Sequence, residues 1–312
     1  MKVILCTTPI DHLKNLKQSL QKYGTLIYKP DINSVELKKL LKKNRRINYI
    51  FCNPNRQGYI LNKNILINSS IKLINTASTG TNHINIDDCN KLGIKVISLT
   101  KDFKLLKKLP STSELAFGLM ISLLRNIPKS FKSVMLKKWD YLPFMGQEIS
   151  GLSLGIIGLG RLGNFMAHYG KSFGMKVRYY DPRVYTKKYR KTSLANLFRL
   201  SDVISIHTHV TNKTRYLIDK SLLKLSKKNQ IIINTSRGEI VNEEDIIHYL
   251  KKKKIYGYAT DVVIDEFGDV KKSIIIKNIQ KLNIIVTPHI GGMTLQGQLR
   301  AWKFAVDKFR TN

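Results

Sequence analysis

Short apolar segments alternate with segments of helical periodicity along almost the whole chain. The short apolar runs predict buried β-strands, and the amphipathic stretches between them predict helices. Over residues 1–100 we predict strands at 3–6, 25–28, 48–52, 72–75 and 95–98, with helices at Asp11 to Lys22 and Ser34 to Lys42. This alternation is typical of a parallel sheet covered by helices.

The same pattern continues through the rest of the chain. A long helix is predicted from Ser111, where Glu114 would complete a capping box, to at least Arg125 before Pro128. Later strands are predicted at 154–157, 176–180, 202–206, 230–234, 256–260 and 284–286, and a last amphipathic helix at about Leu295 to Phe309. We therefore predict an α/β fold with two doubly wound, Rossmann-like parallel-sheet domains and the active site in the cleft between them.

A glycine-rich turn follows the strand predicted at 154–157. Gly158, Gly160 and Gly163 have the spacing G-x-G-x-x-G, and a helix is predicted directly after them. The first glycine allows a tight turn, the second lets the backbone approach a pyrophosphate, and the third lets the helix pack closely on the strand. The phosphates would lie against N–H groups at the helix N-terminus. We predict a dinucleotide site that includes Gly158, Gly160, Arg161, Leu162 and Gly163.

An acidic residue stands where the second strand of this unit should end. Asp181 follows the strand predicted at 176–180 and lies 18 residues beyond Gly163. A carboxylate at this distance is expected to accept hydrogen bonds from the ribose diol. It would also repel a 2′-phosphate, so the predicted cofactor is NAD rather than NADP.

Length, charge and cysteine content narrow the class of protein. The 312 residues suit two domains. No apolar run reaches the ~20 residues of a membrane span, the first residues resemble a strand rather than a signal peptide, and the three cysteines lack C-x-x-C spacing. We therefore expect a cytoplasmic protein with no membrane partner. The net charge of +33 is spread along the chain, without an arginine-rich arm, so we expect no nucleic-acid partner.

Three strand ends in the second half carry side chains suited to catalysis. Arg237 follows the strand predicted at 230–234, Glu266 follows that at 256–260, and His289 follows that at 284–286. The carboxyl ends of parallel strands share one edge of the sheet. Each residue alone has an ordinary interpretation as a surface or loop residue. Together at one edge, they indicate a catalytic group.

The chemistry of these side chains fits the reduction of a 2-oxo acid. Arg237 would bind the carboxylate, because a guanidinium keeps its charge and binds carboxylates bidentately. His289 would transfer the proton, since histidine titrates near neutrality, and Glu266 would hold the ring and favour its protonated form. His207 ends another strand, and either a cofactor contact or a structural role is open. The histidines have no metal-ligand spacing, so no metal is predicted.

Longer motifs resemble the D-isomer-specific 2-hydroxyacid dehydrogenases, the family that contains phosphoglycerate dehydrogenase. The resemblance covers nearly the whole chain and is carried by Ser113 to Ala116, Arg125 to Pro128, Gly151 to Pro182, Asn234 to Gly238, and Pro288 to Gly292. It implies that Arg237, Glu266 and His289 are the catalytic residues. It also places Asp261 at the nicotinamide carboxamide.

Further binding residues follow from the resemblance and from strand ends. The loop Thr76 to Thr81 is similar to the family loop whose backbone binds the substrate carboxylate, through Ser78, Thr79 and Gly80. Arg56 follows a strand of the first domain and would meet a second anionic group such as a phosphate, although a surface role is equally open. We also predict cofactor contacts from His207, Thr208, Thr235 and Ser236.

The resemblance implies a discontinuous organisation. A flavodoxin-like substrate-binding domain would comprise 1–100 and 290–312, and an NAD-binding Rossmann domain would comprise 101–289. A homodimer is expected through the 111–150 region. Two positions depart from the family pattern, because Phe267 and His209 stand where the family has prolines.

The predicted function is therefore NAD-dependent interconversion of a (2R)-hydroxy acid and its 2-oxo acid. A 3-phosphoglycerate-like substrate is one interpretation, favoured by Arg56 and by the run Phe144 to Gly146. Hydroxypyruvate or glyoxylate reduction is the nearest alternative. An NAD(H)-sensing binding protein of the corepressor type is a third.

Overall fold

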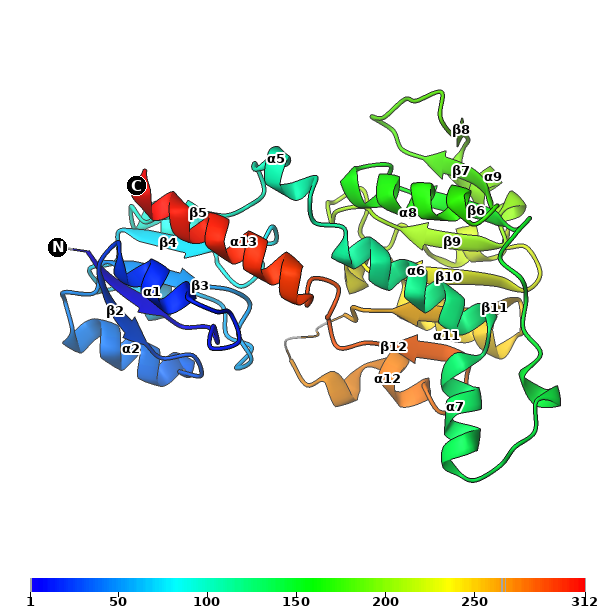
Figure 1. Ribbon diagram of the computed structural model, residues 1–312, viewed down its shortest axis with the longest axis horizontal. Helices are drawn as coiled ribbons and strands as arrows, with labels where there is room; N and C mark the ends of the chain where they lie inside the picture. The colour runs from blue at the N-terminus through cyan, green and yellow to red at the C-terminus, as the bar shows by residue number, and fades with distance from the viewer. Residues whose placement is uncertain (1, 265, 267, 312) are drawn as a thin grey trace. The chain divides into compact units, whose positions relative to one another are not determined.

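The computed structural model describes residues 2–264, 266 and 268–311, and it divides into two compact units. One unit comprises Met1–Leu109 and Met293–Asn312, and the other comprises Pro110–Gly292 (Figure 1). Each unit is a parallel α/β sheet, as the alternation of strands and helices predicts. Phe267, one of the two departures from the family pattern, lies outside the described residues.

The first unit contains a five-stranded sheet in the order β2-β1-β3-β4-β5. Its strands are β1 Val3–Cys6, β2 Thr25–Tyr28, β3 Tyr49–Cys52, β4 Leu73–Thr76 and β5 Lys95–Ile97. Successive residues of a strand face opposite sides of the sheet. Ile4 and Cys6 accordingly join one apolar cluster, and Leu5 joins the other.

Helices cover both faces of this sheet. The cluster that contains Ile4 is completed by α1 Leu16–Gln21 and by α13 Leu295–Asp307, which returns from the end of the chain (Figure 1). The other cluster is completed by α2 Ser34–Lys43, α3 Lys63–Leu66 and α4 Ile86–Lys91. Two ring pairs, Phe51 with Trp302 and Phe51 with Phe309, tie the last helix and the turn after it to the sheet.

The second unit contains a seven-stranded sheet in the order β12-β11-β10-β9-β6-β7-β8. Its strands are β6 Ser153–Ile157, β7 Lys176–Tyr180, β8 Arg190–Lys191, β9 Val203–Ile206, β10 Gln230–Asn234, β11 Ile255–Thr260 and β12 Ile284–Val286. The chain order reverses between β6 and β9. In open parallel sheets, ligands bind beyond the carboxyl ends of the strands at such a reversal.

The helices of the second unit also lie on both faces of its sheet. One face is covered by α6 Ser111–Leu124 and α8 Arg161–Ser172. The other is covered by α9 Leu194–Leu200, α10 Lys220–Leu223, α11 Glu243–Lys251 and α12 Ile274–Asn278. α7, which spans Ile127–Met135, has no buried residue. Within the described residues, every helix is too short or too polar to span a lipid bilayer.

The helix predicted from Ser111 does begin there, but its predicted cap is wrong, and so is the predicted start of another helix. The capping box expected at Ser111 and Glu114 does not form, because Pro110 is the N-cap and Ser111 already lies in the first turn. The helix predicted from Asp11 begins only at Leu16, because Asn15 adopts a left-handed conformation with φ of 65°. A regular helix cannot pass through such a residue.

The bounds of the units also differ from the predicted domains at residues 101–109 and 290–292. α5, which spans Phe103–Leu106, belongs with the first unit, because Leu106 joins its core and Asp102 pairs with Lys308. Ile290 and Gly291 belong with the second, because their N–H groups donate to Asp261.

Candidate active site

The glycine turn connects β6 to α8. Gly158 has φ of 88°, and a Cβ there would lie 2.6 Å from the carbonyl oxygen of His207, so only glycine fits. A Cβ on Gly163 would lie 2.0 Å from the carbonyl oxygen of Gly158, which brings the helix against the turn. A Cβ on Gly160 would meet no atom within 4 Å. The fold therefore needs glycine at 158 and 163, whereas the space beside Gly160, the N-cap of α8, is open.

Asp181 lies beside this turn at the carboxyl end of β7. Its Oδ2 accepts the N–H of Leu159 at 2.9 Å, and its Oδ1 accepts the N–H groups of Arg183 at 2.8 Å and Val184 at 2.9 Å. A carboxylate offers about four acceptor positions, so Asp181 can still accept a hydrogen bond from a ribose diol. The open space at Gly160, the helix N-terminus and this carboxylate together fit a dinucleotide.

The predicted cofactor residues at the neighbouring strand ends differ in their surroundings. His207 is held through Nε2 by Ser205 Oγ at 2.8 Å, and burial lowers its pKa to about 3, so the ring is neutral at physiological pH. It therefore offers no positive charge to a phosphate. Thr208 is partly buried. Ser236 Oγ donates to the carbonyl of Ile206 at 2.8 Å, whereas the buried Oγ1 of Thr235 has no hydrogen-bond partner among the described residues.

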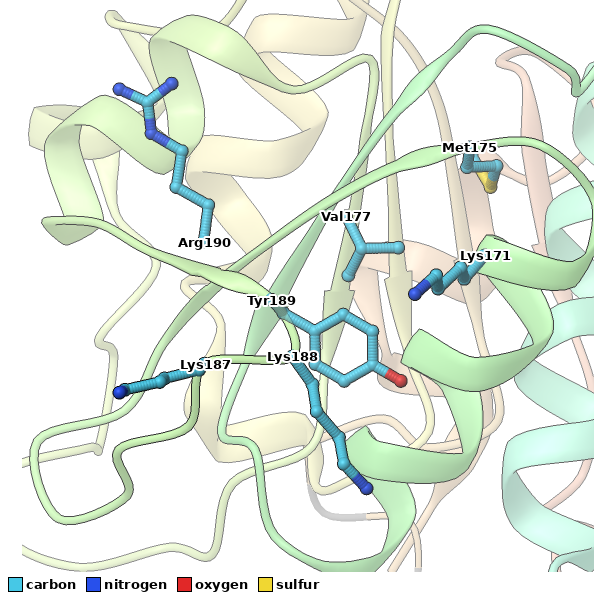
Figure 2. Close-up of a pocket in the computed structure, with 7 residues that line it drawn as sticks. All are labelled: Lys171, Met175, Val177, Lys187, Lys188, Tyr189 and Arg190. Atoms are coloured by element: carbon cyan, nitrogen blue, oxygen red, sulfur yellow. The ribbon is translucent and has the colours of Figure 1, made fainter.

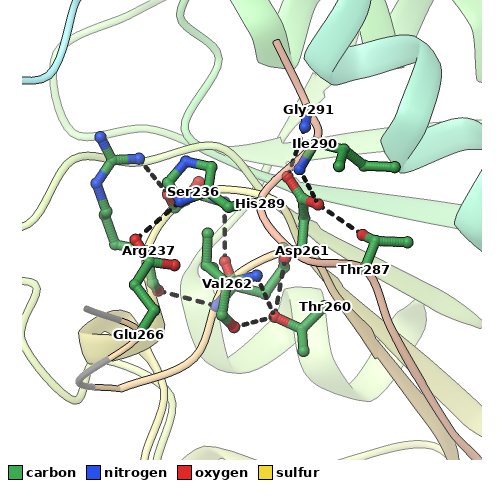
Figure 3. A network of polar contacts seen from close by, with 11 residues as sticks. Ser236, Arg237, Thr260, Asp261, Val262, Glu266, Thr287, His289, Ile290 and Gly291 are labelled. Carbon is green, nitrogen blue, oxygen red and sulfur yellow. Dashed lines mark hydrogen bonds and ion pairs between the residues drawn. The ribbon is translucent and has the colours of Figure 1, made fainter. Parts of the chain in front are cut away.

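Arg237 lies in a turn that the side chain of Asn234 closes. Asn234 is fully buried; its Nδ2 donates to the carbonyl of Arg237 at 2.9 Å and its Oδ1 accepts the N–H of Ser236 at 3.0 Å. The Arg237 guanidinium donates to the carbonyl of Ser236 at 2.7 Å (Figure 3). Asparagine commonly closes turns in this way. An asparagine three positions before Arg237 is the feature of the sequence from which this turn could have been predicted.

Asp261 organises the loop that carries His289. Asp261 is 2% exposed. Its carboxylate accepts hydrogen bonds from the hydroxyl of Thr287 at 2.6 Å and from the N–H groups of Ile290 at 2.8 Å and Gly291 at 2.7 Å (Figure 3). Burial raises the pKa of this carboxyl group, and these hydrogen bonds act in the opposite direction. The family resemblance implies a contact of Asp261 with the nicotinamide; the structure shows that Asp261 shapes the His289 loop.

His289 and Glu266 are in direct contact. His289 Nδ1 lies 2.8 Å from Glu266 Oε1, although the two residues belong to loops after different strands (Figure 3). The Glu266 side chain is 15% exposed and that of His289 is 40% exposed. A carboxylate that accepts from one ring nitrogen fixes the ring orientation and leaves Nε2 for proton exchange.

A glycine brings two of these loops into backbone contact. A Cβ on Gly238 would lie 2.3 Å from both the nitrogen of Ile264 and the carbonyl carbon of Val263. The loop with Arg237 therefore touches the loop with Glu266, and any side chain at Gly238 would separate them. No pattern in the sequence showed this contact.

The predicted substrate loop lies in the first unit, after β4. Thr76 Oγ1 contacts Ser78 Oγ and the Nε2 of the buried His83, each at 3.0 Å. Thr100 Oγ1 donates to the carbonyl of Thr79 at 2.7 Å. Among the described residues, no acceptor is bonded to the N–H groups of 78–80. Arg56 is exposed in the loop after β3.

The second unit also has a hollow that lies apart from Arg237, Glu266 and His289. Its lining includes Lys171, Lys188 and Tyr189 (Figure 2). It lies along the first half of β7, away from the carboxyl end that Asp181 follows. Within the described residues, no three His, Cys, Asp or Glu side chains gather in a way that could hold a metal ion.

The chain belongs to the D-isomer-specific 2-hydroxyacid dehydrogenase family. The family's NAD binding domain matches residues 117–291, and its catalytic domain matches residues 4–105. The chain thus carries the NAD-binding domain of this family, and the glycine turn and Asp181 lie inside it.

Curated relatives include two enzymes with different substrates. The chain is 31% identical to D-3-phosphoglycerate dehydrogenase of Bacillus subtilis, over 74% of this chain and 43% of the relative. It is 32% identical to hydroxypyruvate reductase of Thermotoga maritima, over 77% of this chain and 76% of the relative. The aligned part thus spans less than half of the first relative.

Solved structures share the fold over the full chain. The apo-structure of D-lactate dehydrogenase from Escherichia coli has a TM-score of 0.84 and 22% identity, covering 100% of this chain and 96% of that one. D-lactate dehydrogenase from Aquifex aeolicus, complexed with NAD and lactic acid, has a TM-score of 0.80 and 27% identity, covering 99% and 95%.

Proposed function

We propose that this protein is an NAD-dependent dehydrogenase that interconverts a (2R)-hydroxy acid and its 2-oxo acid. The observation that carries the proposal is the 2.8 Å contact between His289 Nδ1 and Glu266 Oε1. This pair follows β11 and β12, at the same sheet edge as Arg237 and the glycine turn. Family membership supports the same assignment.

Each side chain has a defined task in this reaction. Bound NAD supplies the hydride acceptor, and its reduced form supplies the donor. Arg237 binds the substrate carboxylate through its planar guanidinium. His289 takes the hydroxyl proton at Nε2 during oxidation and returns it to the carbonyl oxygen during reduction. Glu266 holds the ring at Nδ1 and stabilises the protonated imidazole. In the first unit, the backbone at Ser78, Thr79 and Gly80 offers further donors to the carboxylate.

The substrate we favour is a 2-hydroxy acid with a second anionic group, of the 3-phosphoglycerate type. Arg56 is exposed in the loop after β3 and would bind the phosphate. D-3-phosphoglycerate dehydrogenases among the relatives support this choice, and hydroxypyruvate reductase supports the smaller alternative. If Arg56 binds the phosphate, R56A should raise KM for 3-phosphohydroxypyruvate and leave KM for hydroxypyruvate unchanged. Equal effects on both substrates would contradict this assignment.

The direct test is a panel of 2-oxo acids assayed by NADH absorbance. The panel should include 3-phosphohydroxypyruvate, hydroxypyruvate, glyoxylate and pyruvate. H289N should lower kcat by ~10²–10⁴-fold, because it removes the proton carrier. The exposed His209 provides the control variant H209A. NADH binding without turnover of any 2-oxo acid would contradict an enzymatic role and favour an NAD(H)-sensing protein.

The same assay tests the cofactor. Asp181 should exclude the 2′-phosphate of NADP by charge repulsion, so turnover with NADPH should be much slower than with NADH. D181A should narrow that difference. Equal use of both cofactors by the unmodified protein would contradict the assignment.

We also propose that two copies of the chain form a dimer through residues 127–145. This segment exposes a set of large apolar side chains: Ile127, Phe131, Val134, Met135, Leu136, Trp139, Tyr141, Leu142 and Met145. So large an exposed apolar group marks an association surface. Light scattering should give twice the chain mass, and W139E should give the single-chain mass. A monomeric unmodified protein would contradict the proposal.

A further inference from the structure

The loop that carries Glu266 is held by a buried carboxylate from another element. Oε1 of Glu243, the first residue of α11, accepts the N–H of Ile264 at 2.9 Å. Ile264 precedes Glu266 by two residues, so the two backbones lie within ~7 Å of each other. The contact therefore fixes the backbone at Ile264, two residues before Glu266.

Glu243 differs from an ordinary acidic residue at a helix start. The residue is 4% exposed, whereas the following residue, Glu244, is exposed. The N-terminus of α11 already has a cap, because Asn242 Oδ1 accepts the N–H of Asp245 at 3.2 Å. A carboxylate this deeply buried is costly unless it is hydrogen-bonded. The N–H of Ile264 supplies such a bond at 2.9 Å.

The N–H of Ile264 that Glu243 binds lies where the Glu266 loop contacts the Arg237 turn. A Cβ on Gly238 would lie 2.3 Å from the nitrogen of Ile264, the same atom whose hydrogen Glu243 binds. Arg237 is the neighbour of Gly238. Glu243 therefore holds the Glu266 loop at the point where that loop contacts the turn that carries Arg237.

We propose that Glu243 is a positioning residue, whose carboxylate fixes the backbone at Ile264 and so keeps Glu266 within hydrogen-bond reach of His289. The inference rests on the proposed function, in which Glu266 acts on His289. In this proposal Glu243 acts on the reaction through the backbone of the loop, to which it is bonded at Ile264. Its loss should therefore reduce the chemical step while cofactor binding is retained.

The test compares E243A, E243D and E243Q with E244Q in the full-length chain. E243A should lower kcat for 2-oxo acid reduction by ~10–100-fold, as a small misplacement of a catalytic group does. The Kd for NADH should stay within about twofold, since Glu243 is not a ligand of the cofactor. The alkaline limb of the kcat/KM profile should move to lower pH. E243Q should recover part of the rate, because its carbonyl oxygen still accepts the bond, and E244Q should match the unmodified protein.

Amide hydrogen exchange supplies a readout that does not depend on turnover. Protection of the Ile264 amide should fall in E243A and E243D and stay unchanged in E244Q. If E243A does not fold, E243D carries the test, because its shorter side chain keeps the charge and loses the reach. Unchanged kcat and an unchanged pH profile in a variant that has lost this protection would overturn the proposal. Absence of turnover in the unmodified protein would contradict the proposed function instead, while the exchange data would still show whether Glu243 holds the loop.

Discussion

Asp261 holds His289 through its backbone carbonyl and holds the loop after His289 through its carboxylate. The carbonyl oxygen of Asp261 accepts the N–H of His289 at 2.9 Å, and the Asp261 carboxylate binds the two N–H groups that follow. His289 has φ of 54°, in the left-handed region. Such a conformation costs a non-glycine residue about 1–3 kcal/mol and persists only where surrounding contacts impose it. Asp261 provides those contacts.

Replacing Asp261 by asparagine should therefore affect both stability and rate. The amide keeps one acceptor oxygen, whereas three donors face the two oxygens of the native carboxylate. At least one buried donor would lose its partner, at a cost of about 1–3 kcal/mol. We expect D261N to lower the free energy of unfolding in urea by this amount and to lower kcat at least tenfold. The exposed Asp87 gives the control D87N. Equal stability of D261N and D87N would contradict a stabilising role for the hydrogen bonds of the Asp261 carboxylate.

Substitution of two glycines should affect folding very differently. In G238A the new Cβ meets backbone atoms of 263 and 264 that cannot yield cheaply, so we expect a loss of about 1–3 kcal/mol and a lower kcat. In G160A the new Cβ meets nothing within 4 Å, so the free energy of unfolding should change by less than about 0.5 kcal/mol. Because the proposed pyrophosphate uses that space, G160A should raise the Kd for NADH. An unchanged Kd for NADH in G160A would contradict binding of the dinucleotide pyrophosphate at this turn.

Removing the charge of Glu266 should change the pH dependence of the reaction. E266Q keeps an acceptor oxygen for His289 Nδ1, but a neutral amide stabilises a protonated imidazole less than a carboxylate does. Reduction of the 2-oxo acid requires the protonated ring. The alkaline limb of kcat/KM should therefore move to lower pH, and kcat should fall. Glu239 lies two residues after Arg237, and E239Q is the matched control; a shift of equal size in E239Q would show a general charge effect.

His83 should make stability depend on pH. Burial lowers its pKa to about 4, and Thr76 Oγ1 contacts its ring at 3.0 Å. An unfolded histidine has a pKa of about 6.5. Between these values the unfolded chain binds a proton that the folded chain does not, so the free energy of unfolding falls as pH is lowered from about 6.5 to about 4, by ~3 kcal/mol in total. Urea denaturation at a series of pH values should show a shallower dependence in H83N. Parallel curves would contradict this contribution.

The sequence determined the strands and the edge at which the site lies. Strands at 3–6, 25–28, 176–180, 230–234 and 284–286 agree with the structure residue for residue, because a buried parallel strand is a short apolar run that local pattern reveals. The placement of Arg237, Glu266 and His289 in the loops that follow strands comes from the same pattern, since parallel strands end at one edge. Local signals failed at Asn15, where a left-handed backbone angle delays the helix start, and at Ser111, where Pro110 takes the N-cap position.

Only the tertiary structure decided how the loops at that edge are held. Glu243 meets Ile264 across 21 positions of sequence, and Asp261 meets Gly291 across 30. A buried carboxylate takes its partner from whatever backbone the packed sheet brings beside it. The close approach at Gly238 likewise depends on two loops from different strands. Residue type and spacing along one chain carry no record of such distances, because packing of the strands creates them.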